Sequence, residues 1–170
     1  MFGLFKKKTA PEGPVTFQFD LDVARTPQEL YRMVDFGDAE CWKKQVGSVD
    51  ATGDRAYRMQ LDMCPELAFD INVLDEEPGK LFVYDCVIVP KTGRLVKTIE
   101  GWQMEGRPDG GSDVTLFVVA EFDDDLTAEE WQAETQMMGM GVHNALMKFK
   151  VHAEMGTEAI REIEAQQALA

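Results

Sequence analysis

The sequence predicts an α+β fold in which a curved antiparallel sheet of six to seven strands wraps around one long C-terminal helix. Two short helices are expected after the first strand. Most of the chain before residue 127 consists of short runs of alternating apolar and polar residues, the pattern of strands with one buried face. The remainder opens with Thr127-Ala128-Glu129-Glu130 and continues to Ala170 without a proline. A Thr-x-x-Glu start is a capping box, so we expect one helix much longer than a connection needs.

The composition favours one folded domain with an acidic surface. A chain of 170 residues with 45% hydrophobic residues suits one core of ordinary size. We expect residues 1–14 to be a flexible tail and residues 15–170 to form the domain. The formal net charge of −14 repels phosphate backbones and argues against a nucleic-acid partner.

The cysteine pattern indicates a reducing compartment. Cys41, Cys64 and Cys86 are odd in number and contain no close pair, so they predict neither a disulfide framework nor a zinc site. We expect buried thiols in a cytoplasmic protein. No HExxH, P-loop or GxGxxG motif occurs, and we therefore expect no metal and no cofactor.

The N-terminus carries a weak membrane signal. No apolar run approaches the roughly 20 residues of a membrane-spanning helix. An apolar tip of Phe2, Leu4 and Phe5 precedes Lys6–Lys8, and such a segment gives at most weak contact with an anionic bilayer. A frayed terminus is the favoured interpretation.

The expected elements follow in a regular order. Strands are predicted over residues 15–25, 57–63, 69–73, 81–89, 95–106 and 114–122, with a weaker one over residues 48–51. Thr26-Pro27-Gln28-Glu29 is a capping box that begins the first short helix, and Asp38 caps a second one that carries Trp42. Short connections predict an antiparallel meander. The nearly continuous apolar run of residues 81–89 indicates a strand covered on both faces for part of its length.

The long C-terminal helix has two apolar faces. One stripe should pack on the sheet, and its members are Trp131, Thr135, Met138, Val142, Ala145, Leu146, Phe149, Gly156, Ile160 and Ile163. The opposite side carries Met137, Met140, Met147, Val151 and Met155. Either the rest of the chain wraps further around the helix, or this side is an exposed patch that forms a homodimer contact, which we favour. Gly139 and Gly141 mark a bend, mark a close helix–helix approach, or are simply tolerated.

This order of elements resembles the SRPBCC or START-like helix-grip superfamily, which includes polyketide cyclases and the birch-pollen-allergen type. The resemblance covers about residues 15 to 165. Four segments carry it: the strand-to-helix entry at residues 23–31, Cys41-Trp42-Lys43, the acidic-Pro hairpin at residues 73–81, and the glycine turn at residues 110–116. It implies a cavity between sheet and helix that binds apolar ligands. Some members are enzymes, but no residue-level signature of an activity is present.

The alternation in the strands and the apolar stripe of the long helix predict which side chains face such a cavity. The expected walls are Met59, Trp102, Met138, Val142 and Phe149, and the expected polar contacts are Tyr57, Glu100 and His152. Glu100 shares a face with Trp102, so an inward Glu100 would be a carboxylate in an apolar pocket and an acid–base candidate. The alternatives are a place at the cavity mouth or pairing with a lysine.

The inward face of residues 81–89 stays open at this point. Asp85 shares parity with Leu81, Val83 and Val87, whereas the other face carries Phe82, Tyr84, Cys86 and Ile88.

Three functions follow from these expectations. The first is reversible binding of a small apolar or amphipathic molecule, such as a lipid, an isoprenoid or a polyketide-like compound. The second is an enzyme of the cyclase, dehydratase or hydrolase kind that uses Glu100 or His152 as its acid–base group. The third is an interaction protein that acts through the methionine-rich helix face.

Overall fold

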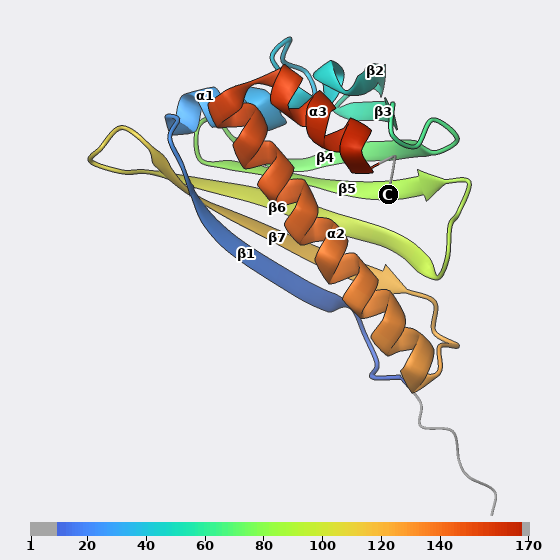
Figure 1. The fold of residues 1–170 in the computed structure, drawn as a ribbon. Helices are drawn as coiled ribbons and strands as arrows, with labels where there is room; N and C mark the ends of the chain where they lie inside the picture. Colours follow the sequence, from blue (N-terminus) through green and yellow to red (C-terminus); the bar gives the residue numbers. More distant parts are fainter. Residues whose placement is uncertain (1–9, 168–170) are drawn as a thin grey trace, which may run out of the picture.

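The protein folds into one curved antiparallel sheet with a long helix across its concave face (Figure 1). The computed structural model describes residues 10–167. The strands are β1 (Val15–Val23), β2 (Gly47–Gly53), β3 (Ala56–Leu61), β4 (Ala68–Glu77), β5 (Leu81–Val89), β6 (Leu95–Gly106) and β7 (Ser112–Phe122). Their order in the sheet is β1-β7-β6-β5-β4-β3-β2, which confirms the predicted meander and the α+β class. The first strand pairs with the last and forms one edge of the sheet.

Four helical segments accompany the sheet. They are α1 (Pro27–Val34), the 3₁₀ helix η1 (Trp42–Gln45), α2 (Ala128–Met155) and α3 (Thr157–Gln167). Both predicted capping boxes form. The amide N–H of Thr26 donates to Glu29 at 2.9 Å, and that of Thr127 donates to Glu130 at 2.8 Å. None of the helices within residues 10–167 is long and apolar enough to cross a membrane.

The outer face of β5 is half-buried at Leu81, Val83 and Asp85 and exposed further along, so the cover on both faces predicted for part of this strand is incomplete. Phe82, Tyr84 and Cys86 are buried on the concave face, whereas Val87 and Val89 are exposed on the other. The reason is that α2 lies on one face of the sheet only (Figure 1). An antiparallel sheet tolerates a solvated face, and valine suits a strand even there.

The C-terminal helix is interrupted, which corrects the predicted continuous helix. Gly156 has φ = 88°, a conformation that glycine adopts readily, and it ends α2 before α3 begins. The chain then turns back along α2, where Ile160 is fully buried and Glu164 pairs with Lys148 at 3.4 Å. Gly156 is therefore the hinge between two helices rather than a member of a sheet-facing stripe.

The two other glycines of this region do not bend α2, which runs unbroken from Ala128 to Met155. A Cβ atom on Gly139 would meet the ring of Phe17 at 3.2 Å, so glycine lets the helix approach β1 closely. Gly141 has nothing within 4 Å of that position. The stripe predicted to face the sheet is buried at Val142, Leu146 and Phe149.

The methionine side of α2 faces away from the core. Met137, Met140, Met147 and Met155 are exposed by 61%, 58%, 42% and 72%, so the interpretation in which the chain wraps around this side is wrong. Val151 is partly buried and packs against the core. The N-terminal residues considered for membrane contact, Phe2, Leu4, Phe5 and Lys6–Lys8, lie outside the described residues.

Candidate functional site

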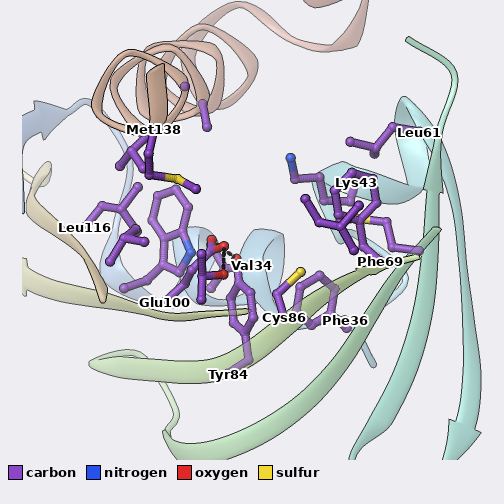
Figure 2. A pocket seen from close by; sticks show the side chains of 18 of the residues that line it. Val34, Phe36, Lys43, Leu61, Phe69, Tyr84, Cys86, Glu100, Leu116 and Met138 are labelled. Atoms are coloured by element: carbon purple, nitrogen blue, oxygen red, sulfur yellow. Dashed lines mark hydrogen bonds between the residues drawn. The ribbon is translucent and has the colours of Figure 1, made fainter. Parts of the chain in front are cut away.

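A cavity lies between the concave face of the sheet and α2 (Figure 2). Its volume is about 210 Å³. Strands β3 to β7 form its floor and walls, α2 covers it, and the segment from α1 to η1 closes one end. The lining residues are Val34, Phe36, Trp42, Lys43, Met59, Leu61, Phe69, Tyr84, Cys86, Ile88, Leu95, Thr98, Glu100, Trp102, Leu116, Val118, Met138, Gly141, Val142 and Ala145.

Five of the eight residues proposed for ligand contact line this cavity. They are Met59, Glu100, Trp102, Met138 and Val142. Three do not: Tyr57, Phe149 and His152. Phe149 is fully buried behind the wall, where its ring centre lies 4.6 Å from that of Trp102.

Glu100 faces inward, because β6 turns Thr98, Trp102 and Met104 to the concave side as well. The hydroxyl of Tyr84 donates to Oε2 of Glu100 at 2.7 Å, and the hydroxyl of Thr98 donates to Oε1 at 2.9 Å. Each oxygen thus accepts one hydrogen bond from the protein. A carboxylate has about four acceptor positions, so Glu100 can also accept a hydrogen bond from a ligand.

The other face of β5, which carries Leu81, Val83, Asp85 and Val87, points outward. The carboxylate of Asp85 accepts a 2.8 Å hydrogen bond from the side-chain amide of Asn72 on the solvent face. Asp85 is therefore no cavity residue, and Tyr84 and Cys86 are. Burial raises the pKa of Tyr84 well above its usual value, and the nearby negative charge of Glu100 raises it further. Burial and Glu100 also raise the pKa of the Cys86 thiol, in that order of importance. Both groups enter the cavity as neutral hydrogen-bonding side chains.

Lys43 is the charged residue among the cavity residues that sequence reasoning missed. Its Nζ atom lies 4.0 Å from the ring centre of Trp42, at the start of η1. Figure 2 shows the ammonium group entering from the side of Leu61 and Phe69, away from Leu116 and Glu100. Burial lowers the pKa of Lys43, and the charge of Glu100 opposes that shift. The only signal in the sequence was the adjacent Trp-Lys pair, and a four-residue 3₁₀ helix has no period long enough to reveal an inward face.

The two histidines lie outside the cavity. The ring of His152 sits 6.0 Å from that of Trp42 and lines a separate surface hollow together with Arg25 and Glu40. Its Nδ1 atom is buried without a hydrogen-bond partner, and burial lowers its pKa. His143 lies against Phe19, with ring centres 5.6 Å apart. Glu100 and His152, the two acid–base candidates, are thus not brought together.

Three aspartates, Asp123–Asp125, precede α2, and two of them pair with basic residues. Asp123 pairs with Lys91 at 2.5 Å and with Arg94 at 3.5 Å, and Asp125 also pairs with Arg94. Within residues 10–167 no group of three or more histidine, cysteine or acidic side chains is arranged to hold a metal ion.

No protein-family model and no curated protein sequence matches the chain. Solved structures do match it. Ara h 8.0201 superposes with a TM-score of 0.60 at 13% identity, covering 91% of this chain and 99% of its own. The di-domain ARO/CYC BexL from the BE-7585A biosynthetic pathway superposes with a TM-score of 0.61 at 15% identity. The match covers 85% of this chain and 51% of BexL. The Aha1 dimer from Colwellia psychrerythraea superposes with a TM-score of 0.56 at 13% identity, and the match covers 84% of this chain and 98% of the Aha1 chain.

Structural similarity at such low sequence identity establishes the fold alone. The chain has the helix-grip fold of the Bet v1-like or SRPBCC proteins, and the resemblance read from the sequence is confirmed at that level.

Proposed function

We propose that this protein reversibly binds a small apolar or amphipathic molecule in the cavity between the sheet and α2. The observation that carries this proposal is the make-up of the walls, where aliphatic, methionine and aromatic side chains surround a few polar groups. Burial of the ligand's apolar surface would supply affinity, and the Glu100, Tyr84 and Thr98 group would orient it. Lipid, isoprenoid and polyketide-like compounds are the candidate classes. Proteins of this fold typically bind hydrophobic ligands.

Native mass spectrometry of the freshly purified protein tests the proposal. A bound adduct that disappears under denaturing conditions is the expected result, and its mass constrains the ligand class. Ala145→Phe should abolish the adduct because residue 145 lines the cavity. Ala133→Phe, on the exposed side of the same helix, is the matched control and should keep it. An adduct that survives in Ala145→Phe, or a wild-type protein that binds no apolar compound, would refute cavity binding.

An enzymatic role is the second candidate, because a carboxylate inside an apolar cavity is a candidate acid–base group. BexL, a structural neighbour, is described as ARO/CYC, which suggests cyclase chemistry as the first class to screen. Glu100 is the stronger candidate for this role, since His152 does not line the cavity. Glu100→Gln should abolish turnover of a substrate while its binding remains. Unchanged turnover in that variant would exclude Glu100 as the acid–base group.

A homodimer is the third proposal. The exposed side chains of Met137, Met140 and Met147 form an apolar strip along α2, continued by the partly buried Val151. Such strips mark interaction surfaces, and the neighbouring Aha1 structure is described as a dimer. Met140→Glu with Met147→Glu should give a folded monomer in sedimentation velocity. Val87→Glu, at an exposed valine on the face of the sheet that α2 does not cover, is the control. A double variant that stays assembled would exclude this contact.

The cytoplasmic location stays a prediction from cysteine usage. The three cysteines are free thiols in the structure, which suits a reducing compartment.

A further inference from the structure

We propose that Lys43 makes the cavity selective for compact apolar molecules that carry one acidic group, which its ammonium group binds. This inference rests on the proposed binding function and names the class of ligand. Four features of the molecule support it: the surroundings of Lys43, the engagement of the nearby carboxylates, the placement of Glu100, and the size of the cavity.

The surroundings of Lys43 are those of a cation without an anion. Its ammonium group lies 4.0 Å from the ring centre of Trp42, and the apolar side chains of Leu61 and Phe69 line the same cavity. No carboxylate of residues 10–167 lies within ion-pair distance of it. A cation–π contact compensates only part of the lost hydration of an ammonium group. The free protein therefore holds a positive charge for which an incoming anion would supply the missing partner.

The acidic groups that influence Lys43 are engaged elsewhere. Glu164 of α3 pairs with Lys148 of α2 at 3.4 Å, and both side chains are largely buried. Glu100 of β6 accepts hydrogen bonds from Tyr84 and Thr98. Neither carboxylate reaches Lys43, so the counter-charge has to come from the ligand.

The placement of Glu100 sets the orientation of that ligand. Lys43 and Glu100 enter the cavity from different sides (Figure 2). An acidic group next to Glu100 would be repelled and would also lose its hydration. The acidic end of the ligand therefore lies at Lys43, and its other end lies near Glu100. A hydroxyl or amide N–H at that other end would meet a carboxylate that can accept a hydrogen bond.

The cavity volume limits the size of the ligand. About 210 Å³ is below the roughly 300–1,000 Å³ of pockets for drug-sized ligands. A lipid with two long chains does not fit this space, whereas an acid with one or two rings, or a short branched chain, does. The class is thus a compact monoanion with an apolar body.

A pair of isosteric probes tests the inference. 2-Naphthoate and 2-naphthamide share one apolar body and differ in the charge of the polar end. Isothermal titration calorimetry gives the Kd of each probe for wild type, and competition between them shows that they share one site. We expect 2-naphthoate to bind about tenfold more tightly or better, the effect of one charge-assisted hydrogen bond.

Three variants complete the experiment. Lys43→Met removes the charge at nearly constant side-chain length and should abolish the preference, with 2-naphthamide still bound. Lys97→Met, on the outer face of β6 where Lys97 pairs with Glu121, changes the net charge equally and should keep it. Lys43→Arg retains a cation and should also keep the preference for 2-naphthoate. If Lys43→Met does not fold, loss of the preference in Lys43→Arg would still contradict the inference.

The two proposals fail in different ways. Equal binding of both probes to wild type, or a preference that persists in Lys43→Met, would overturn the role of Lys43 and leave cavity binding intact. Absence of binding by both probes to wild type would overturn cavity binding and the selectivity together.

Discussion

Tyr84 and Glu100 are direct cross-strand partners on β5 and β6, and the hydroxyl of Tyr84 donates a 2.7 Å hydrogen bond to the carboxylate of Glu100. Thr98, two residues earlier on β6, donates to the other carboxylate oxygen. This arrangement places one hydrogen-bonded polar cluster on an otherwise apolar floor. We expect this pair to contribute to stability, and in the proposed function it would orient the ligand.

A double-mutant cycle measures the contribution of this pair to stability. Tyr84→Phe and Glu100→Ala should each lower the free energy of unfolding by about 1–3 kcal/mol, because each leaves a buried polar partner unsatisfied. The double variant should be less unstable than the sum, with a coupling energy of about 1–3 kcal/mol. Urea denaturation gives all four values. Tyr57→Phe, at a ring that packs 5.8 Å from Phe36 outside this cluster, is the control and should change stability by less than about 0.5 kcal/mol.

The tyrosines predict how the protein responds to alkaline pH. Burial raises the pKa of Tyr31, Tyr57 and Tyr84, the three tyrosines of the chain, and nearby Glu76, Asp35 and Glu100 respectively raise them further. A group whose pKa is higher in the folded state stabilises the fold fully below its unfolded pKa, about 10 for tyrosine. That contribution is lost as the pH rises toward the folded pKa. Stability should therefore fall above pH 10.

Tyrosinate absorbance followed during an alkaline titration checks this expectation. The absorbance should stay flat past pH 10 and then rise together with the loss of circular dichroism, because unfolding releases the phenols. A separate absorbance step near pH 10 in a protein that remains folded would contradict the assigned burial. Tyr84→Phe removes one group whose ionisation favours the unfolded chain, so the free energy of unfolding of this variant should fall less steeply with pH above pH 10.

Two glycines of the C-terminal segment should respond to alanine in opposite directions. Gly156→Ala should destabilise the protein by about 1–2 kcal/mol, because φ = 88° strains any side chain and the residue sets the turn between α2 and α3. Gly141→Ala should stabilise it by up to about 1 kcal/mol, since position 141 is inside α2 and a Cβ atom there meets nothing within 4 Å. Thermal unfolding of both variants is the measurement. Equal effects of the two substitutions would contradict the break at Gly156.

Gly101 should not tolerate alanine unless Phe117 is also changed. The two residues are cross-strand partners, and a Cβ atom on Gly101 would overlap the ring of Phe117. Gly101→Ala should cost about 1–3 kcal/mol, the usual effect of overpacking. Adding Phe117→Leu should recover part of this loss, because the shorter side chain leaves room for the methyl group. Denaturant midpoints of the single and double variants decide the matter, and purely additive losses would be inconsistent with the contact.

Much of the fold was predictable because its signals are local. Alternation in β1 and β6, the Thr26 and Thr127 capping boxes, and the turn before β5 each depend on a few neighbouring residues. Strand alternation placed Met59 and Trp102 on the cavity, and the apolar stripe of the long helix placed Met138 and Val142 there. Whether the break at Gly156 would occur was not predictable locally, since isolated glycines are tolerated in helices. The same helix continues through Gly139 and Gly141.

The sequence by itself thus determined the order of the elements, their caps and the two parities of each strand. Only the tertiary structure decided which parity of β5 faces the core, because alternation is unchanged when a strand is turned over and the choice depends on which face α2 covers. It also decided that Lys43 enters the cavity while His152 stays behind Trp42. Those positions follow from how η1 packs against α2, where Trp42 contacts Phe149 and His152, residues more than a hundred positions away.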